Sequence, residues 1–245
     1  MSDTIISVRG VTKVYRMGEE EVHALRGITL DIQRGEYVSI MGPSGSGKST
    51  FFNIVGGLDR PTAGEVLMEG AHLSDLSSDQ LAWVRCNRIG FIFQSFNLIP
   101  TMTAVENVAI GRIFSGTEPE QAHEDAAKML TRVGLGERLD HLPSEVSGGQ
   151  QQRIAIARAL VNTPGVILAD EPTGNLDLKT GQEIIDLLNE MKEELGITII
   201  TATHDMKMLS ASDTVVWIED GSIKRTARKG EVEIEIGSID GETIA

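Results

Sequence analysis

Three short runs of apolar residues interrupt the otherwise mixed pattern of the chain. They are YVSIM at 37–41, GVILAD at 165–170 and ITIITATH at 197–204. Runs this short and this continuous are typical of strands that are buried on both faces of a parallel sheet. We therefore expect three central strands at these places.

Apolar residues at helical spacing, recurring at i, i+3, i+4 and i+7, lie between and beside these strands. The first such stripe, which includes Leu58, directly follows the first strand. Strands that alternate with helices predict an α/β fold with a mostly parallel sheet. The stripes predict helices over 51–58, 118–133, 147–162 and 184–195.

Period-two patterns predict further strands. Residues 5–15 and 22–32 carry β-branched side chains near period two, with a polar turn at 16–21 between them, and predict two strands. TVVWIEDGSIKRT at 214–226 contains an Asp-Gly turn and predicts a hairpin.

The chain is expected to form one main domain over 1–228, followed by an acidic tail at 229–245. The segment from about 95 to 160 shows helical patterns and no convincing strand. We therefore predict an inserted α-helical subdomain there.

Composition narrows the range of partners. The 22 basic and 36 acidic residues give a net charge of −14, and no basic patch predicts nucleic acid as a partner. The single cysteine, Cys86, excludes an internal disulfide and fits a reducing, cytosolic compartment. The N-terminus lacks the apolar core of a signal peptide, and no stretch approaches the roughly 20 apolar residues of a membrane helix. We expect a cytoplasmic protein that does not cross a bilayer by itself.

A glycine-rich loop, GPSGSGKST, joins the first central strand to the helix after it. It matches G-x-x-x-x-G-K-S/T in the strand-then-helix context in which such a loop binds phosphate, which argues against a flexible linker. The N–H groups of the loop and the N-terminus of the following helix suit phosphate oxygens. Lys48 adds a full positive charge near the β and γ phosphates of a bound nucleotide. Ser49 offers its hydroxyl to Mg²⁺. A bound ligand is expected to hold the loop rigid. The candidate nucleotide-binding residues are Gly42, Pro43, Ser44, Gly45, Ser46, Gly47, Lys48, Ser49 and Thr50.

The other two central strands end in polar side chains that suit the same chemistry. Asp170 and Glu171 follow the second strand, and His204 ends the third. Asp170 can hold the hydration shell of Mg²⁺, Glu171 can accept a proton from an attacking water, and His204 is placed to sense a γ-phosphate. Taken alone, such residues are more often turns, helix caps or structural histidines. A phosphate loop at the same edge of the sheet reverses that preference.

The stretch VSGGQQQRIAIARAL at 146–160 resembles the signature motif of the ATPase subunits of ABC transporters, followed by its helix. The usual motif begins with leucine, where this chain has Val146. A phosphate loop fits many NTPases, but together with this signature it fits essentially one superfamily. The resemblance covers about residues 4–225. It implies a P-loop NTPase with a RecA-like, mostly parallel sheet, an antiparallel β subdomain and an inserted α-helical subdomain.

The resemblance also implies roles for single residues. Tyr15 is similar to the aromatic residue that stacks on adenine, so we expect its ring to matter and its hydroxyl to be nearly dispensable. Gln94 is similar to the glutamine that touches Mg²⁺ and water beside the membrane domain. Residues 174–177, GNLD, are similar to the loop that crosses to the partner subunit, and His204 to the switch histidine.

The signature motif also predicts a second anion site. Ser147 can cap a helix, and with Gly148 and Gly149 it presents N–H donors at a positive helix end. The resemblance implies that these residues and Gln150 bind the γ-phosphate of ATP held by a second copy of the chain. Two chains would then enclose two ATP molecules head to tail.

The stretches 22–32, 56–66 and 96–108 are closest to one subgroup, the lipoprotein-release, macrolide-export and cell-division ABC ATPases. The resemblance therefore implies an ATPase on the inner face of the cell membrane that drives an integral membrane permease, in export or in lipoprotein or lipid extraction. One alternative is signalling through a membrane partner to cell-wall hydrolysis. Another is a soluble ATPase acting on DNA or ribosomes, against which the short single cassette and the negative charge argue.

The segment 95–111, which follows Gln94, is unusually apolar for a loop that leaves a strand. An exposed apolar patch often marks a partner site, so we predict that the membrane permease docks here. Phe96, Leu98 and Ile99 are the expected rim of the groove. For Val105 and Val108, packing inside the helical subdomain is an equal alternative.

Overall fold

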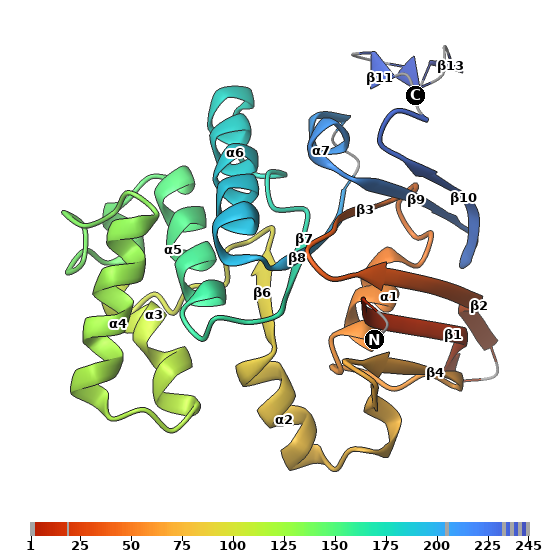
Figure 1. Cartoon of the computed structure of the whole chain (residues 1–245), viewed down its shortest axis with the longest axis horizontal. Helices are drawn as coiled ribbons and strands as arrows, with labels where there is room; N and C mark the ends of the chain where they lie inside the picture. Colours follow the sequence, from red (N-terminus) through yellow and green to blue (C-terminus); the bar gives the residue numbers. More distant parts are fainter. Residues whose placement is uncertain are drawn as a thin grey trace. The chain divides into compact units, whose positions relative to one another are not determined.

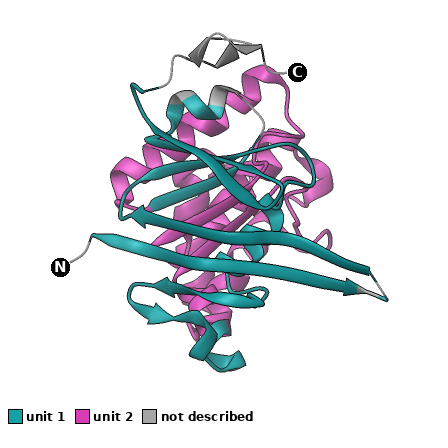
Figure 2. Ribbon diagram, turned by 90° about the vertical axis from the view of Figure 1, so that its right-hand side faces the viewer, with its two compact units in different colours: residues 1–81, 198–245 teal, residues 82–197 magenta. Residues whose placement is uncertain are grey.

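The computed structural model describes residues 3–18, 20–203 and 206–231, together with three short strands between 234 and 243. Contacts within the chain divide it into two compact units (Figure 2). The first unit combines residues 1–81 with 198–245, and the second is residues 82–197.

An antiparallel sheet in the first unit has the strand order β2-β1-β4-β5 (Figure 1). The period-two pattern predicted its two long strands, since Ile6 and Val8 are fully buried while Ser7 between them is not. The strands extend into the predicted polar turn and leave only residues 18 and 19 between them. The strands are β1 (Thr4–Met17), β2 (Glu20–Gln33), β4 (Ala63–Met68) and β5 (Ala71–His72).

The first unit also contains parallel strands around β3 (Tyr37–Met41), which pairs with β8 (Thr198–Ala202) on one side and β9 (Thr214–Glu219) on the other. Every residue of β3 and β8 is buried, as their continuous apolar runs predicted. β9 forms the predicted hairpin with β10 (Ser222–Arg228), and both turn residues, Asp220 and Gly221, have positive φ.

Helix α1 (Lys48–Val55) follows β3 and buries most of the predicted stripe, including Phe51 and Ile54. Leu58 was wrongly placed in that stripe, because the helix ends at Gly56 and the Leu58 side chain is 51% exposed. The remaining elements of this unit are η1 (Leu73–Asp75), α7 (Met206–Ala211), β11 (Ile234–Glu235), β12 (Ser238–Ile239) and β13 (Glu242–Thr243).

The second unit combines two parallel strands with a group of helices. β6 pairs with β7, and α3, α4 and α5 pack on one another (Figure 1). The boundary between the units falls within α2 (Ser78–Asn87). The elements are β6 (Ile89–Phe93), α3 (Ala104–Phe114), α4 (Pro119–Arg132), η2 (Pro143–Glu145), α5 (Gly148–Leu160), β7 (Val166–Asp170) and α6 (Leu178–Leu195).

The segment expected as one loop over 95–111 is a loop only as far as Thr103. Thr103 begins α3 with a capping box, in which its side chain accepts from the Glu106 N–H and the Glu106 carboxylate accepts from the Thr103 N–H. The fully buried side chain of Asn107 then bonds to both backbone groups of Ile99, at 2.7 and 3.1 Å. Val108 is also fully buried, so for this residue the packing alternative is correct.

Candidate functional site

Two glycines of the phosphate loop are required by close packing. Gly42 has φ +152°, and a Cβ there would lie 2.0 Å from the carbonyl oxygen of Ile218. Gly47 has φ +107°, and its Cβ would lie 2.5 Å from the carbonyl oxygen of Ala24. Any side chain at either position would collide with neighbouring backbone, so the motif glycines let the loop lie against β2 and β9.

Hydrogen bonds within the chain fix the shape of this loop. The Lys48 ammonium donates to the carbonyl oxygens of Gly42, at 2.6 Å, and Pro43, at 3.0 Å. The Ser46 N–H donates to the Pro43 carbonyl oxygen, and the Gly221 N–H donates to that of Ser46. Part of the rigidity that we expected from a ligand is therefore supplied by the chain itself.

The helix end behind the loop is suited to an anion. Gly47 is the N-cap of α1 and offers no side chain to cap the first-turn N–H groups. Such an N-terminus carries a partial positive charge and donors that suit phosphate oxygens. The Ser46 hydroxyl is buried and has no hydrogen-bond partner among the described residues, while Ser49 is exposed in the first turn.

Tyr15 lies on β1, in the same unit as the phosphate loop. Its side chain is half-buried, and its hydroxyl donates to Oδ2 of Asp59 at 2.9 Å. Burial and then the bond to Asp59 raise the pKa of Tyr15, whereas hydrogen bonding by the Thr50 side chain opposes that rise.

The acid pair stands at the end of β7 in the second unit. Four buried residues lead to Asp170, and Glu171 follows with φ +48°, in the left-handed region that non-glycine residues rarely adopt. Such strain costs on the order of 1–3 kcal/mol and clusters at functional sites. The next residue, Pro172, is buried. The strained backbone of Glu171 is thus flanked by a buried residue, which distinguishes it from an exposed surface turn.

Gln94 and the GNLD loop lie together in the second unit. The Gln94 side-chain amide donates to Oδ1 of Asn175 at 3.3 Å, and the Asn175 amide donates to the Gln94 carbonyl oxygen at 2.9 Å. A Cβ on Gly174 would lie 2.7 Å from Nε2 of Gln94, so the glycine allows this contact. Asp177 caps α6 by accepting from the N–H groups of Lys179 and Thr180.

The signature motif forms the start of α5. The Ser147 hydroxyl accepts from the Gln150 N–H at 3.3 Å, and the Gln150 side chain accepts from the Ser147 N–H at 2.9 Å, so Ser147 is the predicted N-cap. Ser147 and Gly148 are exposed. A Cβ on Gly149 would lie 2.4 Å from the Thr180 methyl group, whereas one on Gly148 would meet only ordinary contacts. Packing within the chain therefore explains Gly149 but not Gly148.

One functional contact was not predicted from the sequence. The buried side chain of Gln152 donates to the carbonyl oxygen of Pro172 at 2.6 Å. This bond ties the signature helix to the residue after Glu171. The run of three glutamines at 150–152 was the available signal, but nothing in it marks the third one as buried.

The residues present also fit a magnesium nucleotide. The described residues contain no group of three or more His, Cys, Asp or Glu side chains that could hold a metal ion. Mg²⁺ at phosphates needs no such group, since it retains waters and takes one or two carboxylates. The exposed Ser49 hydroxyl and the half-buried Asp170 carboxylate are ligands of that kind. The predicted switch residue, His204, lies outside the described residues.

Comparison with known proteins identifies the family. Residues 25–174 match the ABC transporter family. The chain is 50% identical, over 93% of its length and 97% of the relative's, to an uncharacterized ABC transporter ATP-binding protein of Thermotoga maritima. It is 48% identical to the macrolide export ATP-binding/permease protein MacB of Rhodopirellula baltica, over 92% of this chain but only 33% of that protein.

A solved structure agrees with the fold. The chain superposes with a TM-score of 0.84, at 46% identity, on a dimeric structure of the ATP-binding cassette MJ0796 in a post-hydrolysis state bound to ADP and Pi. The match covers 91% of this chain and 98% of that one. The predicted α/β fold class and the predicted family are confirmed. The chain belongs to the ABC transporter family, as one of its ATP-binding cassettes.

Proposed function

We propose that this chain binds ATP with Mg²⁺ in the loop at 42–50 and hydrolyses it to drive a membrane partner. The observation that carries the proposal is the phosphate loop between β3 and α1, with its close-packed glycines and a helix N-terminus that has no side-chain cap. The names of its relatives, ATP-binding proteins of ABC transporters, support it.

The chemistry needs positioning and charge stabilisation more than covalent help. Backbone N–H groups of the loop and the Lys48 ammonium hold the β and γ phosphates. Ser49, Asp170 and Gln94 would hold Mg²⁺ and its waters, and the bound ion would supply positive charge beside the phosphates. Glu171 accepts the proton of the attacking water. His204, which is similar to the switch histidine of the family, is the proposed sensor of the γ-phosphate.

Two copies of the chain act together, head to tail. Ser147 and Gly148 are exposed at the N-terminus of α5, which carries a partial positive charge. Ser147, Gly148, Gly149 and Gln150 bind the γ-phosphate held by the other copy. Among the described residues only ordinary contacts would meet a Cβ on Gly148, so packing there does not require glycine, which supports this role. The dimer described for MJ0796 supports it as well.

The partner is an integral membrane permease, and the output is export or extraction of a lipid or lipoprotein. Relatives named as macrolide export proteins carry ATP-binding and permease parts in one chain, which favours transport over signalling to cell-wall hydrolysis. Among the described residues, no helix is long and apolar enough to cross a bilayer. In this proposal the chain acts on the cytoplasmic face of the membrane through the permease.

The permease docks on the second unit, beside the loop after Gln94. Leu98 and Ile99 are half-buried there, and two large apolar side chains are more exposed: Trp83 on α2, at 56%, and Phe114 at the end of α3, at 76%. The Asn162 amide donates to the carbonyl oxygens of both Cys86 and Gly111, so the ends of α2 and α3 that bear these side chains lie together. Exposed apolar side chains of this kind often mark a partner surface.

Phosphate release by the purified chain with Mg²⁺ and ATP tests the proposal. Glu171→Gln keeps the shape of the side chain but removes its basicity, so turnover should fall by about 10²–10⁴-fold. ATP should still bind, and the variant should accumulate as a dimer in size-exclusion chromatography. Glu190→Gln, an exposed change on α6, is the matched control. Wild-type turnover in Glu171→Gln would contradict the proposed role.

A further inference from the structure

The Tyr15 hydroxyl is part of a network of charged side chains. The role expected for Tyr15, stacking of its ring on adenine, does not require this hydroxyl. It donates to Oδ2 of Asp59 at 2.9 Å, and the other carboxylate oxygen, Oδ1, accepts from the Lys13 ammonium at 2.7 Å. Burial alone would raise the pKa of Asp59, but the hydrogen bonds from Lys13, Tyr15 and the Arg60 N–H, together with the charge of Lys13, outweigh it and lower that pKa. Asp59 is therefore a charged acceptor, whose hydrogen bonds are stronger than those of a neutral one.

Lys13 also covers one face of the Tyr15 ring. Its ammonium lies 4.8 Å from the ring centroid, and its side chain is only 13% exposed. A cation over an aromatic face is attracted to the ring, which fixes the lysine there. A base that stacks on Tyr15 must therefore use the opposite face.

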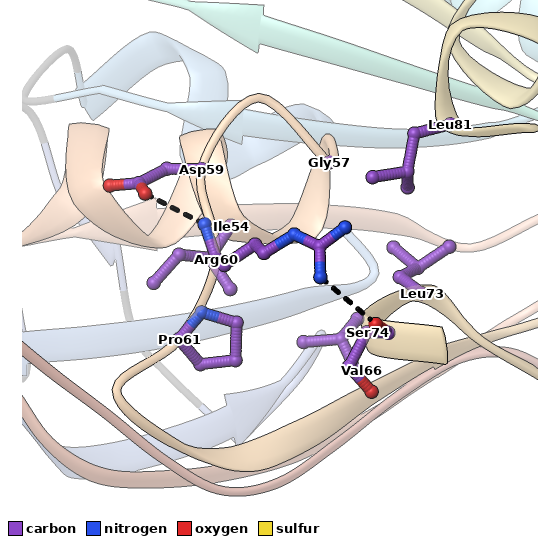
Figure 3. Close-up of a pocket in the computed structure, with 9 residues that line it drawn as sticks. All are labelled: Ile54, Gly57, Asp59, Arg60, Pro61, Val66, Leu73, Ser74 and Leu81. Carbon is purple, nitrogen blue, oxygen red and sulfur yellow. Dashed lines mark hydrogen bonds between the residues drawn. The ribbon is translucent and has the colours of Figure 1, made fainter. Parts of the chain in front are cut away.

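Asp59 itself is held on a braced turn beyond α1. Its N–H donates to the Asn53 carbonyl oxygen at 3.0 Å, and its Oδ1 accepts from the Arg60 N–H at 2.7 Å. The Arg60 guanidinium then donates to the carbonyl oxygen of Ser74, at 3.2 Å (Figure 3), and to that of Leu76, at 3.1 Å. The cavity in Figure 3 has a volume of only about 10 Å³, so this region is packed around the arginine rather than open to a ligand.

We propose that Asp59 is a positioning residue for nucleotide binding, which holds the Tyr15 ring in the orientation that stacks on adenine. The inference rests on the proposed stacking role of Tyr15. It changes the expectation drawn from the sequence, in which Tyr15→Phe is nearly silent. Removal of the hydroxyl releases the ring from Asp59, so Tyr15→Phe and Asp59→Ala should weaken binding of the base by similar factors.

Calorimetric titration with ADP and with pyrophosphate tests the proposal, because the two ligands share the diphosphate and only ADP carries the base. Tyr15→Ala should weaken ADP binding by about 5- to 150-fold, the range for loss of one base–aromatic stack. Asp59→Ala should weaken it by about 5-fold, the effect of one hydrogen bond. Neither variant should change the affinity for pyrophosphate by more than about 2-fold, within measurement scatter.

Three further variants complete the experiment. Asp59→Asn keeps an acceptor for the Tyr15 hydroxyl and should lose less ADP affinity than Asp59→Ala. In a Tyr15→Ala background, Asp59→Ala should not weaken the affinity for ADP any further, because no ring remains to be positioned. Asp31→Asn is the matched control, since Asp31 pairs with Arg9 through side chains that are both 43% exposed, and it should bind both ligands normally.

The outcomes separate this inference from the function on which it rests. If Tyr15→Ala binds ADP as well as the wild type does, the stacking role itself is wrong, and the inference falls with it. If Tyr15→Ala weakens ADP binding and Asp59→Ala does not, only the positioning role is overturned. It is also overturned if Asp59→Ala weakens ADP and pyrophosphate equally, because the change would then act through the phosphate loop.

Discussion

The guanidinium of Arg158 donates a hydrogen bond of 2.7 Å to the backbone carbonyl oxygen of Phe96. A second bond, of 2.6 Å, reaches the carbonyl oxygen of Asn97. Phe96 and Asn97 have φ of +60° and +50°, which is strained for residues other than glycine. Burial lowers the pKa of Arg158. A buried charge is costly unless it is hydrogen-bonded, so these two bonds stabilise the guanidinium as well as the two carbonyl groups. The signature helix thereby holds the loop after Gln94 in a strained shape.

Removal of this guanidinium should destabilise the protein. Arg158→Met leaves two carbonyls without a charged donor and should lower the free energy of unfolding by about 1–3 kcal/mol, measured by urea unfolding. Asn97→Gly relieves the strain at that residue and should restore part of the loss in the Arg158→Met background. Arg16→Met removes a guanidinium from a side chain that is 80% exposed and should be silent. An Arg158→Met protein as stable as the wild type would show that the contact has little energetic weight.

The proposed nucleotide site shared by two chains predicts a specific defect in Ser147→Arg. The bulky cation should leave ATP binding by the single chain intact but block dimerisation with ATP, measured by size-exclusion chromatography. When Ser147→Arg chains are mixed with Lys48→Ala chains, each heterodimer should keep at most one complete site. Ser144→Arg, an exposed change three residues earlier, is the control. ATP-dependent dimers that survive Ser147→Arg would rule out a shared site.

Docking of the permease predicts a separation of two functions. Glutamate at Trp83, Leu98 or Phe114 should leave ATP binding and folding unchanged, because these side chains are partly or largely exposed. The same variants should lose co-purification with the membrane subunit from native membranes, identified by mass. Val22→Glu places the same charge at an exposed apolar residue of β2, where Val22 is 46% exposed, and should retain the complex. If the complex survives all three glutamates together, the docking surface lies elsewhere.

The cap of α6 predicts a pH-dependent contribution to stability. Hydrogen bonds from the Thr180 side chain and backbone lower the pKa of Asp177. A carboxylate with a lowered folded-state pKa stabilises the fold above its unfolded pKa, about 3.9, and loses that effect as pH falls through the folded value. Asp177→Ala should therefore lower the Tm at pH 7 and pH 5 alike, with a deficit that shrinks below about pH 4. Asp140→Ala, an exposed change, should show no such trend. A deficit that persists unchanged at pH 3 would contradict the role of the charge.

Local sequence predicted much of this fold, because many elements carry their own signal. The continuous runs of β3 and β7 are buried as expected, and the Asp-Gly pair forms the predicted turn. Helix α3 was missed although Thr103 and Glu106 form a readable capping box, because the apolar residues before it suggested an exposed loop. Leu58 was misplaced because the helical period continues past the glycine that ends α1.

The residues of the candidate site show the same difference between features with a local sequence signal and features without one. Motif residues such as Lys48 and Ser147 could be selected as candidates from the sequence, because the motifs that contain them are continuous in sequence. Gln152 and Arg158 could not, because each acts on a carbonyl oxygen that tertiary structure brings to it. The Asp59 contact with Tyr15, across 44 residues of chain, has no local signal either.

The bonds from Lys48 to the carbonyls of its own loop bear on the thermodynamics of binding. Ordering a backbone costs about 1–2 kcal/mol of conformational free energy per residue. Hydrogen bonds from Lys48, Ser46 and Gly221 already order the loop in the folded chain. The entropic cost of ordering the loop is therefore part of the free energy of folding and not of phosphate binding. The free energy of the phosphate contacts is then available for affinity, as in other preorganised sites. The glycine-rich run at 42–50, flexible by composition, is thus held by hydrogen bonds in the folded protein and would meet a phosphate already ordered.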